Sequence, residues 1–172
     1  MRLIVLDLDS TLVFTEDGLQ HECGGRYVLE FEDGTGCEGV WRNHWKEFLE
    51  TINQHFDVAV WSAGEYEYVH LISDMIKEII PLKFVLTRDD CEELPDKNEV
   101  SIQKPFHKIF THYPEYTYEN SVIIDDNSYV AYNNPINHIG IIPFKGEPDD
   151  ELLNLAKRLV DNKDIEDVFH IM

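Results

Sequence analysis

The sequence predicts an α/β fold in which a central parallel sheet of about five strands is flanked by helices. Short apolar runs alternate along the chain with segments of helical period, which is typical of a parallel sheet with helices on its faces. The apolar runs are continuous in Val, Ile and Leu, and this favours strands that are buried on both sides. The length of 172 residues suits one hydrophobic core, so residues 1–172 are predicted to form a single domain.

Apolar runs bounded by turn residues are the candidate strands. In chain order they are Arg2–Asp7, Asp57–Trp61, Lys83–Leu86, Ser121–Asp125 and His138–Ile142. We expect these runs to form the parallel sheet.

Three segments carry apolar stripes at helical spacing. The stripes are Trp45, Phe48, Leu49 and Ile52; Val69, Ile72, Ile76 and Ile79; and Leu152, Leu153, Ala156, Leu159 and Val160. Asn43 is a candidate N-cap for the first helix, and Pro81 stops the second. The third starts near Asp149, where acidic residues favour the positive end of the helix dipole. All three stripes are predicted to face the core.

Two segments do not fit the alternation of strands and helices. Glu16–Gly39 holds six glycines around the apolar run Tyr27–Phe31, which predicts a β-hairpin flap after the first strand that could cover a site. Arg88–Ser101 is polar and acidic, and it is predicted to be an exposed loop or a small insert.

The charge balance argues against one class of partner. The chain has 14 Lys and Arg residues against 34 Asp and Glu residues, a formal net charge of -20. Phosphodiester backbones are repelled by such a surface, and no basic patch offsets it, so a nucleic-acid partner is not expected. The acidic excess fits either solvated faces, the interpretation we favour, or a dedicated basic partner.

The cysteine content bears on the compartment. Cys23, Cys37 and Cys91 cannot all pair internally, and no CxxC spacing is present, so we expect an intracellular protein of the cytoplasm or nucleus. A zinc site built from Cys23 and Cys37 with His21 and His44 is an alternative with irregular ligand spacing. No apolar run has the length of a membrane span, so neither a signal peptide nor a membrane anchor is expected.

Two carboxylates follow the first predicted strand. Strand side chains alternate, so Asp7 and Asp9 point to the same side at the carboxyl end of the strand, where open α/β sheets bind ligands. Carboxylates this close require either a cation between them or a proton on one of them. Both conditions serve phosphoryl transfer, because an ionised Asp can attack phosphorus while a protonated Asp can protonate the leaving oxygen. A turn with Asx hydrogen bonds is the alternative for this pair.

Complementary groups follow two other predicted strands. Ser62 and Ala63 come after the second strand, where a small hydroxyl and backbone N–H groups before a helix suit a phosphate cradle, or else a simple N-cap. Asp125, Asp126 and Asn127 come at the end of the fourth strand and offer the hard oxygen ligands that Mg2+ prefers, although a turn would use the same residues.

Lys104 precedes a predicted short helix that leads back to the fourth strand. Four carboxylates in one cleft require positive charge, and Lys104 with Mg2+ would hold Asp7 near an incoming phosphate. The significance of Lys104 therefore rests on its position within the set.

These residues, in this order, resemble the four motifs of the haloacid dehalogenase (HAD) superfamily. The motifs are Asp7-Leu8-Asp9-Ser10-Thr11-Leu12-Val13, then Ser62, then Lys104, then Asp125-Asp126. The chain is more closely similar to the FCP/SCP-like, or NLI-interacting-factor-like, phosphatases, which include the RNA polymerase II C-terminal-domain phosphatases. That similarity also includes Val60-Trp61-Ser62-Ala63-Gly64, Ser121-Val122-Ile123-Ile124-Asp125-Asp126-Asn127-Ser128 and Ile142-Pro143-Phe144. It spans nearly the whole chain and implies a Rossmann-like HAD fold without a large cap domain.

The resemblance implies a Mg2+-dependent phosphatase with an aspartyl-phosphate intermediate. Asp7 would be the nucleophile and a metal ligand. Asp9 would act as general acid and then general base, with its backbone carbonyl on the metal. Thr11 would support the loop, Ser62 would bind phosphoryl oxygens, and Lys104 would neutralise the nucleophile and the phosphate.

The resemblance also implies a metal pair and a substrate contact. Asp125 and Asp126 would complete the metal site directly or through water, and a shift of one residue, to Asp126 and Asn127, stays open. Arg88 matches an arginine that could touch the substrate. Relatives have a hydrophobic pocket in the insert before Lys104, whereas the corresponding segment here is acidic and would repel a multiply phosphorylated peptide.

The expected function is therefore hydrolysis of a phosphomonoester on a phosphorylated protein or peptide, at Ser or Thr. A phosphatase for small molecules, nucleotides or nucleic-acid ends would need the same catalytic residues and is a second hypothesis. A catalytically silent binding module is a third, and the retention of Asp7, Asp9, Lys104 and Asp125 together argues against it, because burying unpaired carboxylates costs stability.

Overall fold

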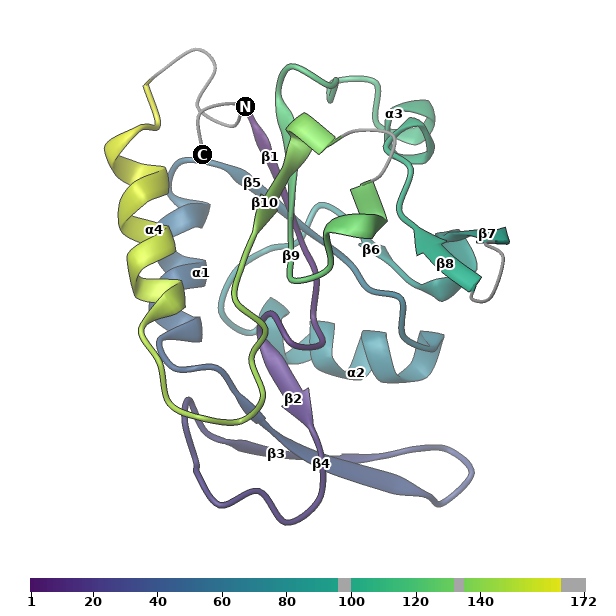
Figure 1. The fold of residues 1–172 in the computed structure, drawn as a ribbon, viewed down its shortest axis with the longest axis vertical. Helices are drawn as coiled ribbons and strands as arrows, with labels where there is room; N and C mark the ends of the chain where they lie inside the picture. Colours follow the sequence, from purple (N-terminus) through teal and green to yellow (C-terminus); the bar gives the residue numbers. More distant parts are fainter. Residues whose placement is uncertain (96–99, 132–134, 165–172) are drawn as a thin grey trace.

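The computed structural model describes residues 1–95, 100–131 and 135–164. Its centre is a sheet of five parallel strands in the order β10-β9-β1-β5-β6 (Figure 1). The strands are β1 (Leu3–Leu6), β5 (Asp57–Trp61), β6 (Val85–Leu86), β9 (Ser121–Asp125) and β10 (His138–Gly140). The predicted parallel sheet is thus confirmed, with edge strands β6 and β10 shorter than predicted.

The central strand β1 is buried along its whole length and divides the core into two clusters. Ile4 and Leu6 face the larger cluster, and Leu3 and Val5 face the other, because successive strand side chains point to opposite faces. The larger cluster packs against α1 (Trp45–Asn53), α2 (Tyr66–Lys77) and α4 (Glu151–Asp161), and the second packs against α3 (His107–His112). Helices therefore cover both faces of the sheet, with α1 beside α4 (Figure 1).

The helix α1 forms where its apolar stripe predicts, and all four stripe residues are buried. The prediction that Asn43 caps it is wrong, because the residue that precedes the helix is His44, in a left-handed conformation with φ 67°. The Asn43 side chain instead accepts a hydrogen bond from the backbone N–H of Asp149, at 3.3 Å. Asn43 therefore joins the start of α1 to the segment before α4.

The other two helices differ from the prediction in detail. The helix α2 ends at Lys77, so Ile79 lies beyond it and is half-buried. In α4 the buried residues are Leu152, Leu155, Ala156 and Leu159, at the i, i+3, i+4 and i+7 positions of one face. The predicted burial of Leu153 and Val160 is wrong, since Leu153 is 43% exposed and Val160 is half-buried. Each lies one residue, about 100° around the helix, from the buried stripe.

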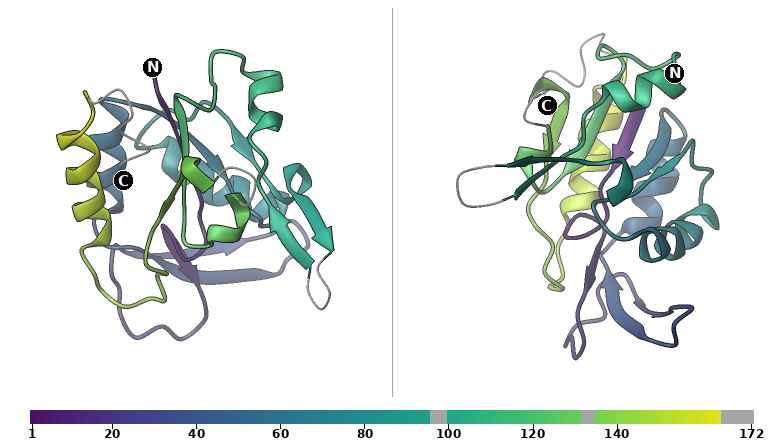
Figure 2. Two further views of the ribbon diagram at one scale, coloured as in Figure 1. Left: turned by 45° about the horizontal axis from the view of Figure 1, so that its top comes forward. Right: turned by 90° about the vertical axis from the view of Figure 1, so that its right-hand side faces the viewer.

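The glycine-rich segment forms the predicted hairpin. Strands β3 (Arg26–Glu30) and β4 (Gly36–Trp41) pair antiparallel, and β4 also pairs with β2 (Val13–Thr15), a strand that was not predicted. These three strands form the flap. It lies beyond the end of the sheet at which β1 finishes, next to α2 (Figure 1), and forms the lower end of the molecule in the right-hand view of Figure 2.

The acidic segment before Lys104 is a small insert, the second of the two forms predicted for it, and it is built as a hairpin. After a 3-10 turn, Arg88–Asp90, strands β7 (Glu92–Pro95) and β8 (Val100–Gln103) pair antiparallel. Within the described ranges these two hairpins are the additions to the sheet and its helices, and no large cap domain is present. None of the helices in the same ranges is long and apolar enough to cross a membrane.

Candidate active site

A tight loop after β1 places two side chains of the first motif face to face. The carbonyl of Leu8 accepts hydrogen bonds from the N–H groups of Thr11, Leu12 and Val13 at 3.1, 2.9 and 3.1 Å. Ser10 takes the left-handed conformation, with φ 64°, that the reversal requires. The hydroxyl of Thr11 then donates to Oδ2 of Asp7 at 2.9 Å. The loop thus fixes the orientation of the Asp7 carboxylate.

A buried lysine joins the first motif to the last. Nζ of Lys104 lies 3.0 Å from Oδ1 of Asp7 and 2.7 Å from Oδ2 of Asp125, and Lys104 is only 2% exposed. Burial alone would lower the pKa of Lys104, but the charges of Asp7 and Asp125 outweigh it and raise the pKa well above its usual value. Lys104 is therefore a permanent cation between two carboxylates.

A third carboxylate completes an acidic group. Oxygens of Asp7, Asp125 and Asp126 all lie within 4.8 Å of one another. Burial, together with the negative charges of Asp7 and Asp125, raises the pKa of Asp126 to about 7. Such crowded hard oxygens fit a divalent cation of the Mg2+ type, which would relieve their repulsion.

The two candidate metal pairs are Asp125 with Asp126 and Asp126 with Asn127, and their side chains differ in their hydrogen bonds and neighbours. Asn127 donates its backbone N–H to Oδ1 of Asp125 at 2.9 Å, and its own Oδ1 accepts from the N–H of Tyr129 at 3.0 Å. The amide of Asn127 is thereby used within its turn, whereas Asp126 lies in the carboxylate group with Asp7. Asp125 and Asp126 thus both belong to the carboxylate group, and the choice between the two metal pairs stays a prediction. Among the described residues, Cys23, Cys37, His21 and His44 form no group whose ligand atoms lie close enough to share a metal ion, so the zinc alternative is not supported.

Asp9 lies at the solvent-facing rim of the site, outside the group of three carboxylates. Its Oδ1 accepts a hydrogen bond of 2.6 Å from the hydroxyl of Tyr68 on α2. Loss of contact with water raises the pKa of the Asp9 carboxyl, and the negative charge of Asp7 raises it further. The hydrogen bond from Tyr68 lowers this pKa and so opposes both effects. Asp9 is thus the more exposed of the two carboxyls of the first motif.

The second motif follows β5 as predicted, at the same end of the sheet as Asp7. Ser62 is fully buried, and its Oγ accepts from the N–H of Gly64 at 3.0 Å, while Ala63 between them is half-buried. A Cβ at Gly64 would meet side-chain atoms of Tyr68, Val69 and Ser62 at 3.0 to 3.2 Å, so this tight turn favours glycine. The turn precedes α2 and leaves the Ser62 hydroxyl hydrogen available.

Arg88 is placed differently from the other predicted residues. Its side chain is 47% exposed, and its guanidinium lies 3.5 Å from the carboxylate of Glu93 on β7. The structure brings Asp7, Thr11, Lys104, Asp125 and Asp126 into one hydrogen-bonded or close-packed group, with Asp9 at its rim. Arg88 instead pairs with the acidic hairpin.

Sequence reasoning missed Arg42, which is fully buried behind the loop of the first motif. It donates to the carbonyl of Thr11 at 3.1 Å and to that of Ile142 at 2.7 Å, and its Nε donates to both carboxylate oxygens of Asp149 at 3.1 Å. The guanidinium also lies 5.4 Å from the ring centroid of Phe144. The signal available in the sequence was its position directly after an apolar strand end, the same position that identified Asp7.

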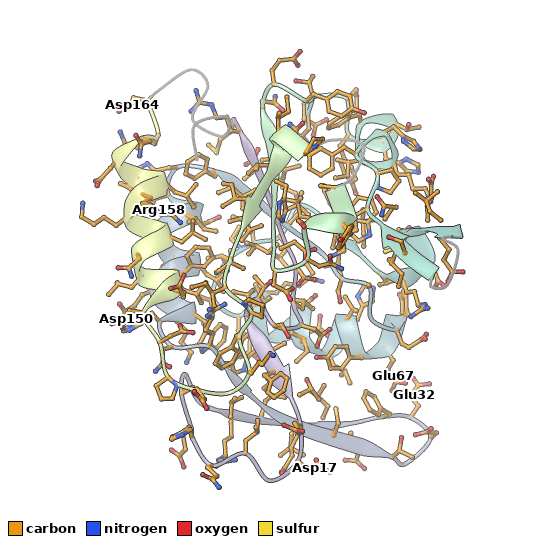
Figure 3. All side chains as sticks on the ribbon, in the orientation of Figure 1. Asp17, Glu32, Glu67, Asp150, Arg158 and Asp164 are labelled. Carbon is orange, nitrogen blue, oxygen red and sulfur yellow. The ribbon has the colours of Figure 1, made fainter. Side chains whose placement is uncertain are left out.

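The flap and α2 meet beside Asp9. The N–H of Glu32 on the flap donates to Oε1 of Glu67 on α2 at 2.7 Å, and Figure 3 shows these two side chains close together. Thr15 of β2 lies 2.7 Å from the hydroxyl of Tyr68. The flap is therefore attached to the helix that carries the partner of Asp9.

Comparison with known protein families gives a match over almost the whole chain. The family described as NLI interacting factor-like phosphatase matches residues 2–169. The chain belongs to this family. NLI interacting factor-like phosphatases are HAD-type phosphoric monoester hydrolases, so the predicted family and enzyme class are confirmed.

Two curated relatives of this NLI interacting factor-like chain carry related names. It is 27% identical over 95 residues to a C-terminal domain phosphatase of RNA polymerase II from Homo sapiens, a match of 52% of this chain and 10% of that protein. It is 26% identical over 169 residues to the ubiquitin-like domain-containing CTD phosphatase 1 of Drosophila melanogaster, a match of 92% of this chain and 48% of that protein. The chain thus spans less than half the length of either relative.

Solved structures show the same fold. The RNA polymerase II CTD phosphatase of fission yeast, bound to beryllium fluoride, superposes with a TM-score of 0.62 at 18% identity, over 96% of this chain and 51% of that one. The 3-deoxy-D-manno-octulosonate 8-phosphate phosphatase of Moraxella catarrhalis superposes with a TM-score of 0.53 at 11% identity, over 95% and 90%. The predicted HAD fold is confirmed.

Proposed function

We propose that this chain is a Mg2+-dependent phosphatase that cleaves phosphomonoesters through an aspartyl-phosphate on Asp7. The observation that carries the proposal is the position of Lys104, which lies 3.0 Å from Asp7 and 2.7 Å from Asp125 at the carboxyl ends of adjacent strands. A buried cation beside a carboxylate keeps that carboxylate ionised and offers charge to an incoming phosphoryl group.

The chemistry has two steps in this proposal. The Asp7 carboxylate attacks phosphorus, the bond from phosphorus to the leaving oxygen breaks, and Asp9 transfers its proton to that oxygen. Asp9 then takes a proton from water, whose oxygen attacks phosphorus and breaks the bond to Asp7, releasing inorganic phosphate. Lys104 holds Asp7 and the phosphoryl group, Thr11 orients Asp7, and Ser62 with the Ala63 N–H binds phosphoryl oxygens.

Asp7, Asp125 and Asp126 would hold the metal through their carboxylates, and Asp9 through its backbone carbonyl. The crowding of the three carboxylates supports this assignment. When bound, Mg2+ supplies positive charge that offsets repulsion between the carboxylates and the phosphate.

The substrate in this proposal is a phosphorylated Ser or Thr of a protein. Two observations support it. The curated relatives are named as phosphatases of a protein domain. Asp9 is exposed at the rim, and the described residues contain no cap domain that would close over a large substrate.

We also infer an intracellular location, supported by the three cysteines, all of which are free.

Hydrolysis of 4-nitrophenyl phosphate with Mg2+ and with EDTA tests the proposal. We expect activity with Mg2+, loss of activity in EDTA, and a fall in kcat of at least about 1,000-fold for Asp7→Asn, because no other group can replace the nucleophile. A phosphoserine peptide should show the same dependence on metal and on Asp7.

Asp161→Asn is the matched control, since Asp161 is 57% exposed at the end of α4 and pairs with Lys157 of the same helix. It should retain the activity of the wild type. Near-normal turnover of Asp7→Asn, or full activity of the wild type in EDTA, would disprove the proposed mechanism.

A further inference from the structure

We propose that a chain of three hydroxyl groups, from Tyr27, Thr15 and Tyr68, positions Asp9 so that its Oδ1 only accepts hydrogen bonds and its Oδ2 carries the catalytic proton. The proposal rests on the proposed function for the role of Asp9 as an acid. Tyr68, Thr15 and Tyr27 act through Asp9 and are positioning residues.

The three hydroxyls form a continuous path that ends on Asp9. The hydroxyl of Tyr68 donates to Oδ1 of Asp9 at 2.6 Å. Oγ1 of Thr15 lies 2.7 Å from the same Tyr68 hydroxyl, and the hydroxyl of Tyr27 is hydrogen bonded to Oγ1 of Thr15. The path brings together α2, β2 and β3, so the two outer strands of the flap both contribute to the position of Asp9.

The direction of every hydrogen bond in the path follows from proton counting. A phenol has a pKa of about 10 and a threonine hydroxyl does not ionise, so each of these groups has one proton at neutral pH. Tyr68 gives its proton to the carboxylate and must accept from Thr15. Thr15 has then used its proton and must accept from Tyr27. All three donors point toward Asp9, and Oδ1 is therefore the acceptor end of the path.

The flap has a structural feature that makes this path possible. Gly39 of β4 is paired with both Thr15 of β2 and Tyr27 of β3. A Cβ at Gly39 would lie closer than 3.0 Å to the Tyr27 hydroxyl and to the carbonyl of Phe14. The absence of a side chain lets the Tyr27 ring cross the middle strand and reach Thr15. Glycine weakens a strand interior, so its position here supports a specific use of the space.

The consequence concerns which oxygen reacts. A carboxyl whose Oδ1 already accepts a strong hydrogen bond binds its proton on the other oxygen. In the first step the Oδ2–H bond breaks, and the proton goes to the leaving oxygen as its bond to phosphorus breaks. In the second step Oδ2 takes the proton of the attacking water. Fixing the carboxyl plane keeps Oδ2 directed to one place in both steps.

The test compares kcat/KM of Tyr68→Phe and the wild type, with Mg2+, across phosphomonoesters whose leaving groups range from 4-nitrophenol to the serine side chain of a peptide. A poor leaving group requires the proton of the acid, whereas 4-nitrophenolate leaves without much assistance. We expect kcat/KM to fall about 30-fold for the phosphoserine peptide and less than about threefold for 4-nitrophenyl phosphate. The inhibition constant of inorganic phosphate should stay unchanged.

Two further variants isolate the path. Tyr27→Phe removes the last hydroxyl while keeping the ring, and it should show the same leaving-group dependence at about two- to fivefold for the peptide. Tyr66→Phe, on the same helix but 62% exposed, is the control and should match the wild type. Melting temperatures of all three variants should confirm that they fold.

The outcomes separate this proposal from the proposed function. An equal loss for every leaving group in Tyr68→Phe would indicate a merely structural role and would overturn the positioning proposal. Unchanged kinetics for every substrate would also overturn it. In both cases an active wild type and an inactive Asp7→Asn would leave the proposed function in place. An inactive wild type would contradict the proposed function and this proposal together.

Discussion

At the scale of single residues, Arg42 connects the loop of the first motif to the C-terminal part of the fold. Its guanidinium donates to the carbonyls of Thr11 and Ile142 and to the carboxylate of Asp149. Thr11 in turn holds Asp7 through its hydroxyl. The rigidity of the Asp7 loop therefore depends on a side chain that does not touch the carboxylates of the site.

We predict that Arg42→Lys destabilises the protein by about 2 kcal/mol, because one ammonium group cannot replace a planar guanidinium that serves three partners, and buried carbonyls lose their donors. For a domain of this length that is a fall of about 4–8 °C in melting temperature. Thermal unfolding followed by circular dichroism measures it.

Arg26→Lys is the matched control for this change. Arg26 donates to the carbonyl of Leu19 at 2.8 Å and lies 3.9 Å from Glu22, so it has the same kinds of partner, but its side chain is 44% exposed. We expect a change within about 0.5 kcal/mol, since water can replace the lost donors. Equal effects at the two positions would show that burial of Arg42 is not the cause.

The site residues that follow strands could be located from the sequence, because a charged residue at the end of an apolar run stands out. Asp7 and Asp125 interrupt or end apolar runs, so a charged group there requires an explanation. Tyr68 escapes notice because an aromatic residue in an amphipathic helix is expected anyway. Thr15 escapes because a strand of three residues, Val13–Thr15, produces no pattern. Their roles depend on contacts between segments far apart in the sequence.

At the scale of elements, the buried strands and the first helix could be predicted, and the surface hairpin β7–β8 could not. Strands buried on both faces must be apolar throughout, so β1, β5 and β9 show clear runs. The hairpin β7–β8 pairs through its backbone while acidic side chains such as Glu92 and Glu93 cover it, so no alternation of apolar and polar residues reveals it.

In the helix α4, the sequence did not identify the buried face correctly, and substitutions on its two faces can test which one packs against the core. Four consecutive positions, from Leu152 to Leu155, contain three leucines, so the sequence permits more than one stripe. In the structure Leu155 is 1% exposed and Leu153 is 43% exposed. The phase of the helix is set by packing against α1, which a single sequence does not display.

We predict that Leu155→Ala lowers the free energy of unfolding by about 2–5 kcal/mol, because it leaves a cavity between α4 and the core. Leu153→Ala, the matched substitution two residues away on the exposed side of the helix, should cost less than about 1 kcal/mol. Urea unfolding of both variants gives the two values. A larger cost for Leu153→Ala than for Leu155→Ala would mean that α4 packs with the face first expected from the sequence.

At the scale of the whole molecule, charge decides which substrates approach. The formal net charge is -20. Acidic side chains also line a hollow between the flap and α2; they are Glu30, Glu32, Glu65, Glu67 and Asp74. A second hollow shares Glu65 and Glu67 with it and is lined by Tyr68, the hydrogen-bond partner of Asp9. A phosphorylated substrate brings more negative charge to this surface, so the residues that flank its phosphate determine whether the encounter is repelled.

We predict that salt changes the KM of phosphopeptides in a direction set by the charge of their flanking residues. Repulsion between exposed charges extends about 20–30 Å at 0.01–0.02 M salt and about 7–10 Å at 0.1–0.2 M. Raising the salt over this range should lower the KM of a phosphoserine peptide with acidic flanks several-fold and raise that of a peptide with basic flanks. At low salt the basic peptide should be the better substrate.

The small substrate 4-nitrophenyl phosphate separates this field effect from any effect of salt on the catalytic group itself. It carries the same phosphate without flanking charges, so its KM should change less than that of either peptide, and division by its value corrects the peptide data. An identical response of all three substrates to salt would show that the acidic surface plays no part in selection. Opposite responses of the two peptides would show that the surface around the site, beyond the residues that transfer the phosphoryl group, selects basic phosphoprotein segments.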